Sequence, residues 1–175
     1  MQKKNNKIGI LGGTFDPPHI GHLHISKQSL KKLKLKKIIW IITKKNPLKK
    51  KPLLDKNTRI KLSKKLVSGN KKILVKYYDD IVKSKNTIDL LKYLKKKNKK
   101  SELFFMMGAD NLINLHKWKN WKKITQLAKI IVFPRSKYSI KALNSVAAKK
   151  LEKNDWKYIP IKKIDISSSL IKKFW

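Results

Sequence analysis

The chain has 175 residues, of which 46 are lysine or arginine and 10 are aspartate or glutamate, so its formal net charge is +36. A hydrophobic fraction of 41% is enough for a packed core and excludes a disordered polycation, while the lack of cysteine excludes disulfides and thiol catalysis. No apolar run is long enough to cross a bilayer, and no signal-peptide pattern follows the basic start, which predicts a cytoplasmic protein.

Almost all of the positive charge is lysine, and it is spread over nearly every segment; Arg59 and Arg135 are the only arginines. This spread is typical of solvated surface positions, whereas a nucleic-acid surface would favour arginine and basic clusters with interleaved aromatic residues. We therefore expect no specific nucleic-acid partner and only weak, salt-sensitive binding. A basic nucleic-acid-binding module is kept as the non-enzymatic alternative.

Short apolar runs alternate with helical patterns along the chain. The first strand is predicted over 7–11, the turn after it over 12–18 and the first helix over 22–35. Further strands are expected at 38–43, 73–77, 103–107, 130–133 and 156–159, and further helices at 58–68, from Thr87 onward, and at 111–115, 118–127, 139–150 and 168–174. This alternation predicts a single-domain, Rossmann-like α/β fold with a doubly wound parallel sheet.

The loop after the first strand carries the clearest chemical pattern, Gly-Gly-Thr-Phe-Asp-Pro-Pro-His-Ile-Gly-His over residues 12–22. Ligands of an open parallel sheet gather beyond the carboxyl ends of its strands. Gly12 and Gly13 would let the backbone approach a phosphate, and the next helix would point free N–H groups at it. His19 and His22 would lie on one face and stabilise charge developing on phosphorus. The spacing matches neither the Walker P-loop nor the dinucleotide fingerprint.

This motif resembles that of the nicotinate-nucleotide adenylyltransferases, a family of the nucleotidyltransferase superfamily with a His-x-Gly-His signature. Residues 87–91, 107–112 and 166–172 resemble three further family segments, and Trp118 falls where the family has a tryptophan. The resemblance covers most of the chain and implies one nucleotidyltransferase domain over 1–175. It implies transfer of AMP from ATP to nicotinate mononucleotide, giving deamido-NAD and pyrophosphate in NAD biosynthesis. Nicotinamide mononucleotide and phosphopantetheine are the alternative acceptors.

The resemblance also implies a role for each matching residue. His19 and His22 would be catalytic, as donors to the phosphates of ATP. Contacts to ATP and its phosphates are expected from Gly12, Gly13, Thr14, Phe15, Gly21, Gly108, Asp110, Arg135, Ser167, Ser168, Ser169 and Lys172. The pyridine nucleotide would be contacted by Lys49, Thr87 and Trp118. Mg²⁺ is expected mainly on the ATP phosphates, with Asp110 as a candidate protein ligand, and a homo-oligomer is left open.

Several of these residues also have a purely structural interpretation. Asp110, Thr87 and the serines at 167–169 suit helix caps, and Trp118 suits core packing. Asp16 is expected to shape the first loop rather than to contact a ligand. Arg59 is expected on the exposed surface of a helix. The segment 46–49, Asn-Pro-Leu-Lys, differs from the Pro-Pro-His-Lys of many family members, and Lys172 stands where they have arginine.

Overall fold

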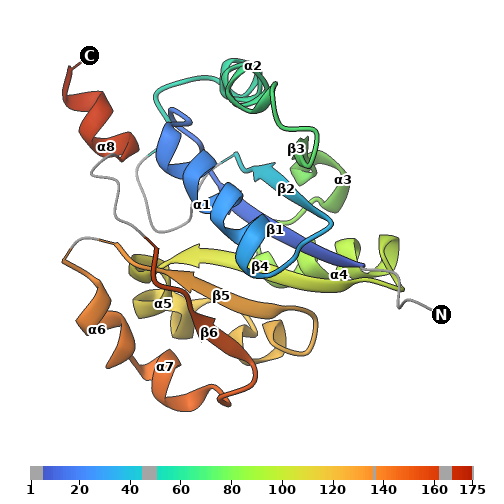
Figure 1. Ribbon diagram of the computed structural model, residues 1–175, viewed down its shortest axis with the longest axis vertical. Coiled ribbons are helices and arrows are strands. Elements are labelled where there is room, and N and C mark those ends of the chain that lie inside the picture. Colours follow the sequence, from blue (N-terminus) through green and yellow to red (C-terminus); the bar gives the residue numbers. More distant parts are fainter. Residues whose placement is uncertain (1–5, 45–50, 136, 162–166, 175) are drawn as a thin grey trace.

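One parallel sheet organises the protein. The computed structural model describes residues 6–44, 51–135, 137–161 and 167–174. The strands run in the order β3-β2-β1-β4-β5-β6 (Figure 1), and their bounds are β1 (Lys7–Gly13), β2 (Lys37–Ile42), β3 (Ile73–Tyr77), β4 (Glu102–Gly108), β5 (Lys129–Phe133) and β6 (Trp156–Tyr158). This order reverses direction between β1 and β4, which is where doubly wound sheets bind ligands. The predicted Rossmann-like fold is confirmed.

Helices cover both faces of this sheet (Figure 1). The long helices are α1 (Ile20–Lys32), α2 (Lys56–Val67) and α4 (Thr87–Lys97). The short ones are α3 (Asp79–Val82), α5 (Ala109–Asn114), α6 (Ser139–Leu143), α7 (Val146–Lys150) and α8 (Ser168–Ile171), with 3₁₀ turns η1 (Leu115–Lys117), η2 (Trp121–Ile124) and η3 (Lys172–Phe174). Strand residues alternate between the two faces, so Ile10 packs in one core cluster and Leu11 in the other.

Two predicted helices are wrong in detail. The helix expected over 139–150 is broken into α6 and α7, because the Ser145 side chain accepts a hydrogen bond from the Ala148 amide and begins a second helix. The helix expected over 118–127 is only the short turn η2. Asn120 precedes it with a left-handed φ of 52°, which a continuous right-handed helix cannot contain.

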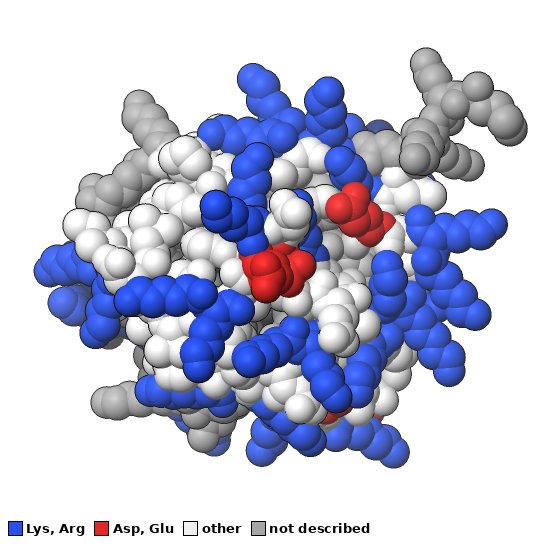
Figure 2. All heavy atoms as spheres, turned by 90° about the horizontal axis from the view of Figure 1, so that it is seen from below, with Lys and Arg blue, Asp and Glu red and all other residues white. Residues whose placement is uncertain are grey.

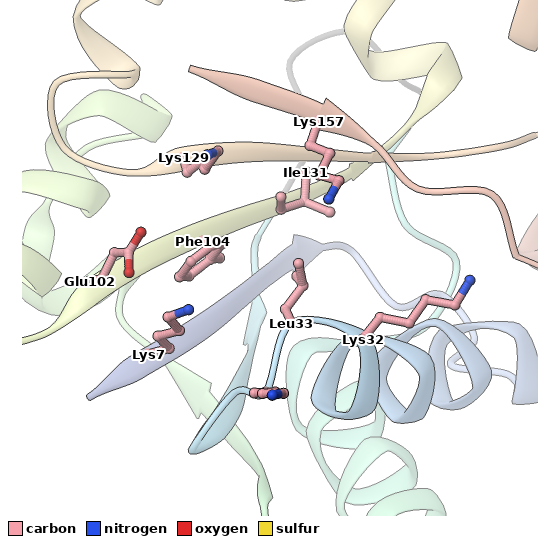
Figure 3. Close-up of a pocket in the computed structure, with 9 residues that line it drawn as sticks. Lys7, Lys32, Leu33, Glu102, Phe104, Lys129, Ile131 and Lys157 are labelled. Carbon is pink, nitrogen blue, oxygen red and sulfur yellow. The ribbon is translucent and has the colours of Figure 1, made fainter. Parts of the chain in front are cut away.

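The surface outside the sheet is dominated by lysine. On the face shown in Figure 2, basic side chains are spread widely, with a few acidic side chains between them. A hollow of about 260 Å³ lies where several strands begin, near Lys7, Glu102 and Lys129, with lysine stems over Phe104 and Ile131 (Figure 3). It is at the opposite end of the sheet from the Gly12–His22 loop. No helix within the described residues is long and apolar enough to span a membrane.

Candidate active site

The first loop is anchored by an aromatic side chain. Phe15 has a left-handed φ of 48° and is only 2% exposed. Its ring stacks on Trp40 with centroids 4.9 Å apart and lies 4.7 Å from the ring of His22. The loop after Gly13 is therefore held against the core by Phe15, and α1 begins at Ile20 directly beyond the carboxyl end of β1.

The two histidines of this loop form a linked pair at the start of α1. His19 is the N-cap, and its Nδ1 accepts a hydrogen bond from the Gly21 amide at 3.1 Å. His22 Nδ1 accepts from the His19 amide at 3.2 Å, and the two ring centroids are 3.9 Å apart. Because Nδ1 is the acceptor in both neutral rings, this hydrogen-bond pattern assigns the ring proton to Nε2. The two rings are thus fixed side by side at the start of α1.

His19 is kept neutral by its surroundings. Burial, together with the smaller effect of the positive charge of Arg135, lowers the pKa of His19 from its usual 6.5 to about 4. Its Nε2 is buried and has no hydrogen-bond partner among the described residues. A buried donor of this kind gains a full hydrogen bond when an anionic oxygen arrives, which fits a phosphate ligand.

A second set of predicted residues meets at the ends of β4 and β5. Asp110 lies in the first turn of α5, and its Oδ2 accepts from Arg135 Nη1 at 2.9 Å. Gly108 is the N-cap of α5, so the interpretation of Asp110 as the cap is wrong. A Cβ atom at Gly108 would lie 2.6 Å from Asp110 Oδ1, which explains the glycine. Arg135 also influences His19 electrostatically, so this set borders the histidine pair.

These residues do not form a protein-built metal cage. Within the described parts of the chain, no group of three histidine, aspartate or glutamate side chains is placed to hold a metal ion. The carboxylate of Asp110 is already paired with Arg135.

The last helix returns to the first loop (Figure 1). Ser167 is the N-cap of α8 and accepts from the Leu170 amide at 3.1 Å, so its capping role is confirmed. The Ser168 hydroxyl donates to the carbonyl of Pro17 at 2.8 Å. Lys172 forms an ion pair with Asp16. Ser168 and Lys172 are thus brought to the histidine loop, whereas Ser167 bonds within α8 and Ser169 is exposed.

Arg59 is the residue that sequence reasoning misplaced. It is only 2% exposed rather than at the surface, and its guanidinium donates to the carbonyls of Thr14 (2.6 Å), Thr43 (2.7 Å) and Leu54 (3.1 Å). The signal was present in the composition. An arginine in a chain that otherwise uses lysine points to a need for several fixed donors, which a guanidinium has and an ammonium lacks.

The residues predicted to contact the pyridine nucleotide are only partly described by the structure. Thr87 is the first residue of α4, and Asn86 is the N-cap, so the capping interpretation of Thr87 is wrong. Trp118 is partly buried against the core, with its ring edge-on to Phe105 at 6.3 Å, which supports its packing role. Lys49, with the rest of the segment 46–49, lies outside the described residues. The sequence suggested no role for Asp89. This residue lies in the first turn of α4, and its carboxylate accepts a hydrogen bond from the Ser84 hydroxyl at 2.7 Å.

Known proteins are similar to this chain over most of its length. Residues 10–174 match the family described as cytidylyltransferase-like. A "Probable nicotinate-nucleotide adenylyltransferase" of Pelagibacter ubique (strain HTCC1062) is 51% identical over 173 residues, covering 99% of this chain and 96% of that protein. A protein of the same name from Clostridium novyi (strain NT) is 38% identical over 172 residues, covering 95% and 85% of the two chains.

Solved structures agree on the fold. Plasmodium falciparum nicotinic acid mononucleotide adenylyltransferase complexed with NaAD has a TM-score of 0.75 and 22% identity, covering 97% of this chain and 83% of that one. The same enzyme complexed with APC has a TM-score of 0.77 and 23% identity, and again covers 97% of this chain and 83% of that one. With the family match over nearly the whole chain and relatives similar over most of their length, this protein belongs to the cytidylyltransferase-like family.

Proposed function

We propose that this protein transfers AMP from ATP to nicotinate mononucleotide and releases deamido-NAD and pyrophosphate, a step of NAD biosynthesis. The observation that carries the proposal is the His19–His22 pair, whose Nε2–H donors stand at the start of a helix beyond the central strand β1. The 51% identity to a relative bearing this enzyme's name supports the choice of substrates.

The reaction requires little covalent chemistry from the protein. The phosphate of the mononucleotide attacks the α-phosphorus of ATP, a new P–O bond forms, and the bond to pyrophosphate breaks with its electron pair on the leaving oxygen. The nucleophile is already an anion, so positioning and charge stabilisation should provide the catalysis. His19 and His22 donate from Nε2 to phosphate oxygens, and the N-terminal amides of α1 face the same negative charge.

The remaining predicted residues surround this centre. Arg135 and Asp110 would contact the adenosine side of ATP, and Ser167, Ser168 and Lys172 would approach its phosphates from α8. ATP would enter as its magnesium complex, with the ion on phosphate oxygens. Thr87 and Trp118 would border the pyridine ring. The cytoplasmic location and the oligomeric state remain predictions from the sequence.

One assay tests the substrates directly. Pyrophosphate release is measured with ATP and, separately, nicotinate mononucleotide, nicotinamide mononucleotide or phosphopantetheine, and the product is identified by mass spectrometry. We expect the fastest release with nicotinate mononucleotide, with deamido-NAD as the product. The matched control is a variant in which His19 and His22 are both replaced by alanine. Faster turnover with another acceptor would contradict the assignment of nicotinate mononucleotide as the substrate. The absence of pyrophosphate release with every acceptor would contradict the proposed transferase activity.

A further inference from the structure

Two buried charged residues, Asp16 and Arg59, hold the two backbone polar groups of Leu54. The Leu54 amide donates to Asp16 Oδ1 at 2.9 Å, and the Leu54 carbonyl accepts from Arg59 Nε at 3.1 Å. Asp16 Oδ2 also accepts from the Leu53 amide at 2.9 Å. The segment 51–55 forms no helix or strand of its own, so its backbone groups depend on such partners.

The same two side chains reach every loop at this corner of the site. Arg59 donates to Thr14 in the first loop and to Thr43 after β2. Asp16 forms an ion pair with Lys172, which directly follows α8. The helix α8 itself is joined to the first loop by the hydrogen bond from Ser168 to Pro17. Asp16 is 1% exposed and Arg59 is 2% exposed, so water does not replace these contacts. Burial opposes the charge of Asp16, but hydrogen bonds from Lys172 and the amides of Leu54 and Leu53 outweigh it and lower its pKa.

We propose that Asp16 and Arg59 are positioning residues of the transfer reaction, which fix the segment 51–55 and α8 at set places relative to the histidine pair. The inference rests on the proposed function for its kinetic test. Asp16 lies three residues before His19, so a shift of the segments it holds moves the catalytic loop itself. A misplacement of about 1 Å in such a site lowers turnover roughly 100-fold.

The partners of this pair distinguish positioning from general stability. Within the described part of the chain, the hydrogen bonds of both side chains go to loops and to Lys172 at the carboxyl edge of the sheet, and none goes to a strand interior. Their loss should therefore leave the sheet folded and disturb the site. Asparagine has the shape of aspartate but only one accepting oxygen, so it cannot serve the Leu53 and Leu54 amides and Lys172 together.

The kinetic test uses Asp16→Asn, Lys172→Met and the double variant. We expect Asp16→Asn to lower kcat about 10- to 100-fold while changing either KM less than about threefold, because alignment rather than binding is lost. If Asp16 works through Lys172 as well as through the loop, the double variant will be less impaired than the product of the two single effects. Lys173→Met is the matched control, since it removes the neighbouring lysine's charge; we expect kcat within about twofold of the wild type.

A second readout does not depend on activity. Amide hydrogen exchange at Leu53 and Leu54 should accelerate at least about tenfold in Asp16→Asn, while exchange at Ile10 in β1 stays as in the wild type. Lys172→Met should leave these two amides protected. If Asp16→Asn does not fold, Arg59→Lys is the second test, because an ammonium lacks the fixed fork that reaches three carbonyls; its kcat should fall about tenfold while the KM for each substrate stays nearly unchanged.

The outcomes separate the two proposals. Normal kcat in folded Asp16→Asn, or unchanged exchange at Leu53 and Leu54, would overturn the positioning role. A fall in kcat that matches only the unfolded fraction would overturn it too. A wild-type chain without transferase activity, but with the expected exchange pattern, would overturn the proposed function and leave the anchoring of the segment 51–55 standing.

Discussion

His19 and His22 each use the Nδ1 atom of the ring to hold a backbone amide, and the buried Nε2 of His19 has no hydrogen-bond partner among the described residues. The Nδ1 bonds to the amides of Gly21 and His19 fix both rings and select the tautomer with the proton on Nε2. The low pKa of His19 makes this donor available across the neutral range without a change of charge. At the scale of the residue, the site is therefore an arrangement of fixed donors rather than a proton shuttle.

Replacing His22 tests that arrangement. We expect His22→Ala to lower kcat by roughly two to three orders of magnitude, the usual effect of removing one donor that stabilises transition-state charge. His22 also caps the His19 amide and contacts Phe15, so a modest fall in melting temperature should accompany it. His24→Ala on the same helix is the control. A His22→Ala enzyme with near-normal kcat would remove this side chain from the mechanism.

The depressed pKa of His19 predicts a pH-dependent stability. The unfolded chain takes up a proton near pH 6.5, whereas folded His19 does so only near pH 4. The contribution of neutral His19 is thus complete above about pH 6.5 and is lost as pH falls toward 4. His19→Asn keeps a good N-cap but cannot titrate. The melting temperature of the wild type should fall relative to that of His19→Asn between pH 7 and pH 5; a constant difference would contradict a buried neutral imidazole.

At the scale of elements, the start of α4 should select the acceptor. Asn86 makes no side-chain cap, so the first turn offers backbone donors and the positive end of the helix to a pyridine carboxylate. A neutral carboxamide would turn its own N–H toward them, at a cost of roughly 2–4 kcal/mol. We expect kcat/KM to be at least about 30-fold higher for nicotinate than for nicotinamide mononucleotide.

Asp89 provides the control for this selectivity. Its pKa is lowered by the hydrogen bond from Ser84, so it is charged and repels a substrate carboxylate at the same helix start. Asp89→Asn should therefore raise the preference for the nicotinate form further. Both acceptors are compared at about 0.15 M salt, where long-range charge is screened. Equal kcat/KM values for the two acceptors in the wild type would show that the start of α4 does not distinguish the carboxylate from the carboxamide.

The sequence predicts elements better than it predicts contacts between loops. Buried parallel strands are nearly continuous apolar runs, so β2 and β5 could be placed closely. The Gly12–His22 motif predicted a candidate catalytic loop because its spacing is specific. The presence of an arginine at position 59 pointed to a need for several fixed donors, but its partners could not be predicted, because Thr14, Thr43 and Leu54 accept through backbone carbonyls, which have no side-chain signature. The break before α7 was missed because Ser145 also occurs inside helices.

At the scale of the whole molecule, the net charge of +36 affects association more than chemistry. The basic side chains are dispersed over the face in Figure 2, whereas the proposed site uses histidines and backbone donors. Binding to an oligonucleotide, followed by fluorescence anisotropy, should weaken steeply between about 0.05 and 0.2 M salt and be the same for unrelated sequences. Sequence-selective binding that survives the higher salt would revive the nucleic-acid-binding module.

The contact between α8 and the first loop has a consequence for synthesis on the ribosome. Pro17 and Ser168 are 151 residues apart, so the histidine loop leaves the exit tunnel long before the helix that meets it. During most of translation, Lys172 has not yet been synthesised, so the ion pair between Asp16 and Lys172 cannot form. The central strand β1 likewise waits for β4 on one side. A nascent chain that stops before residue 167 would carry both histidines and the β1–β4 pairing, but not the α8 contacts that complete the candidate active site.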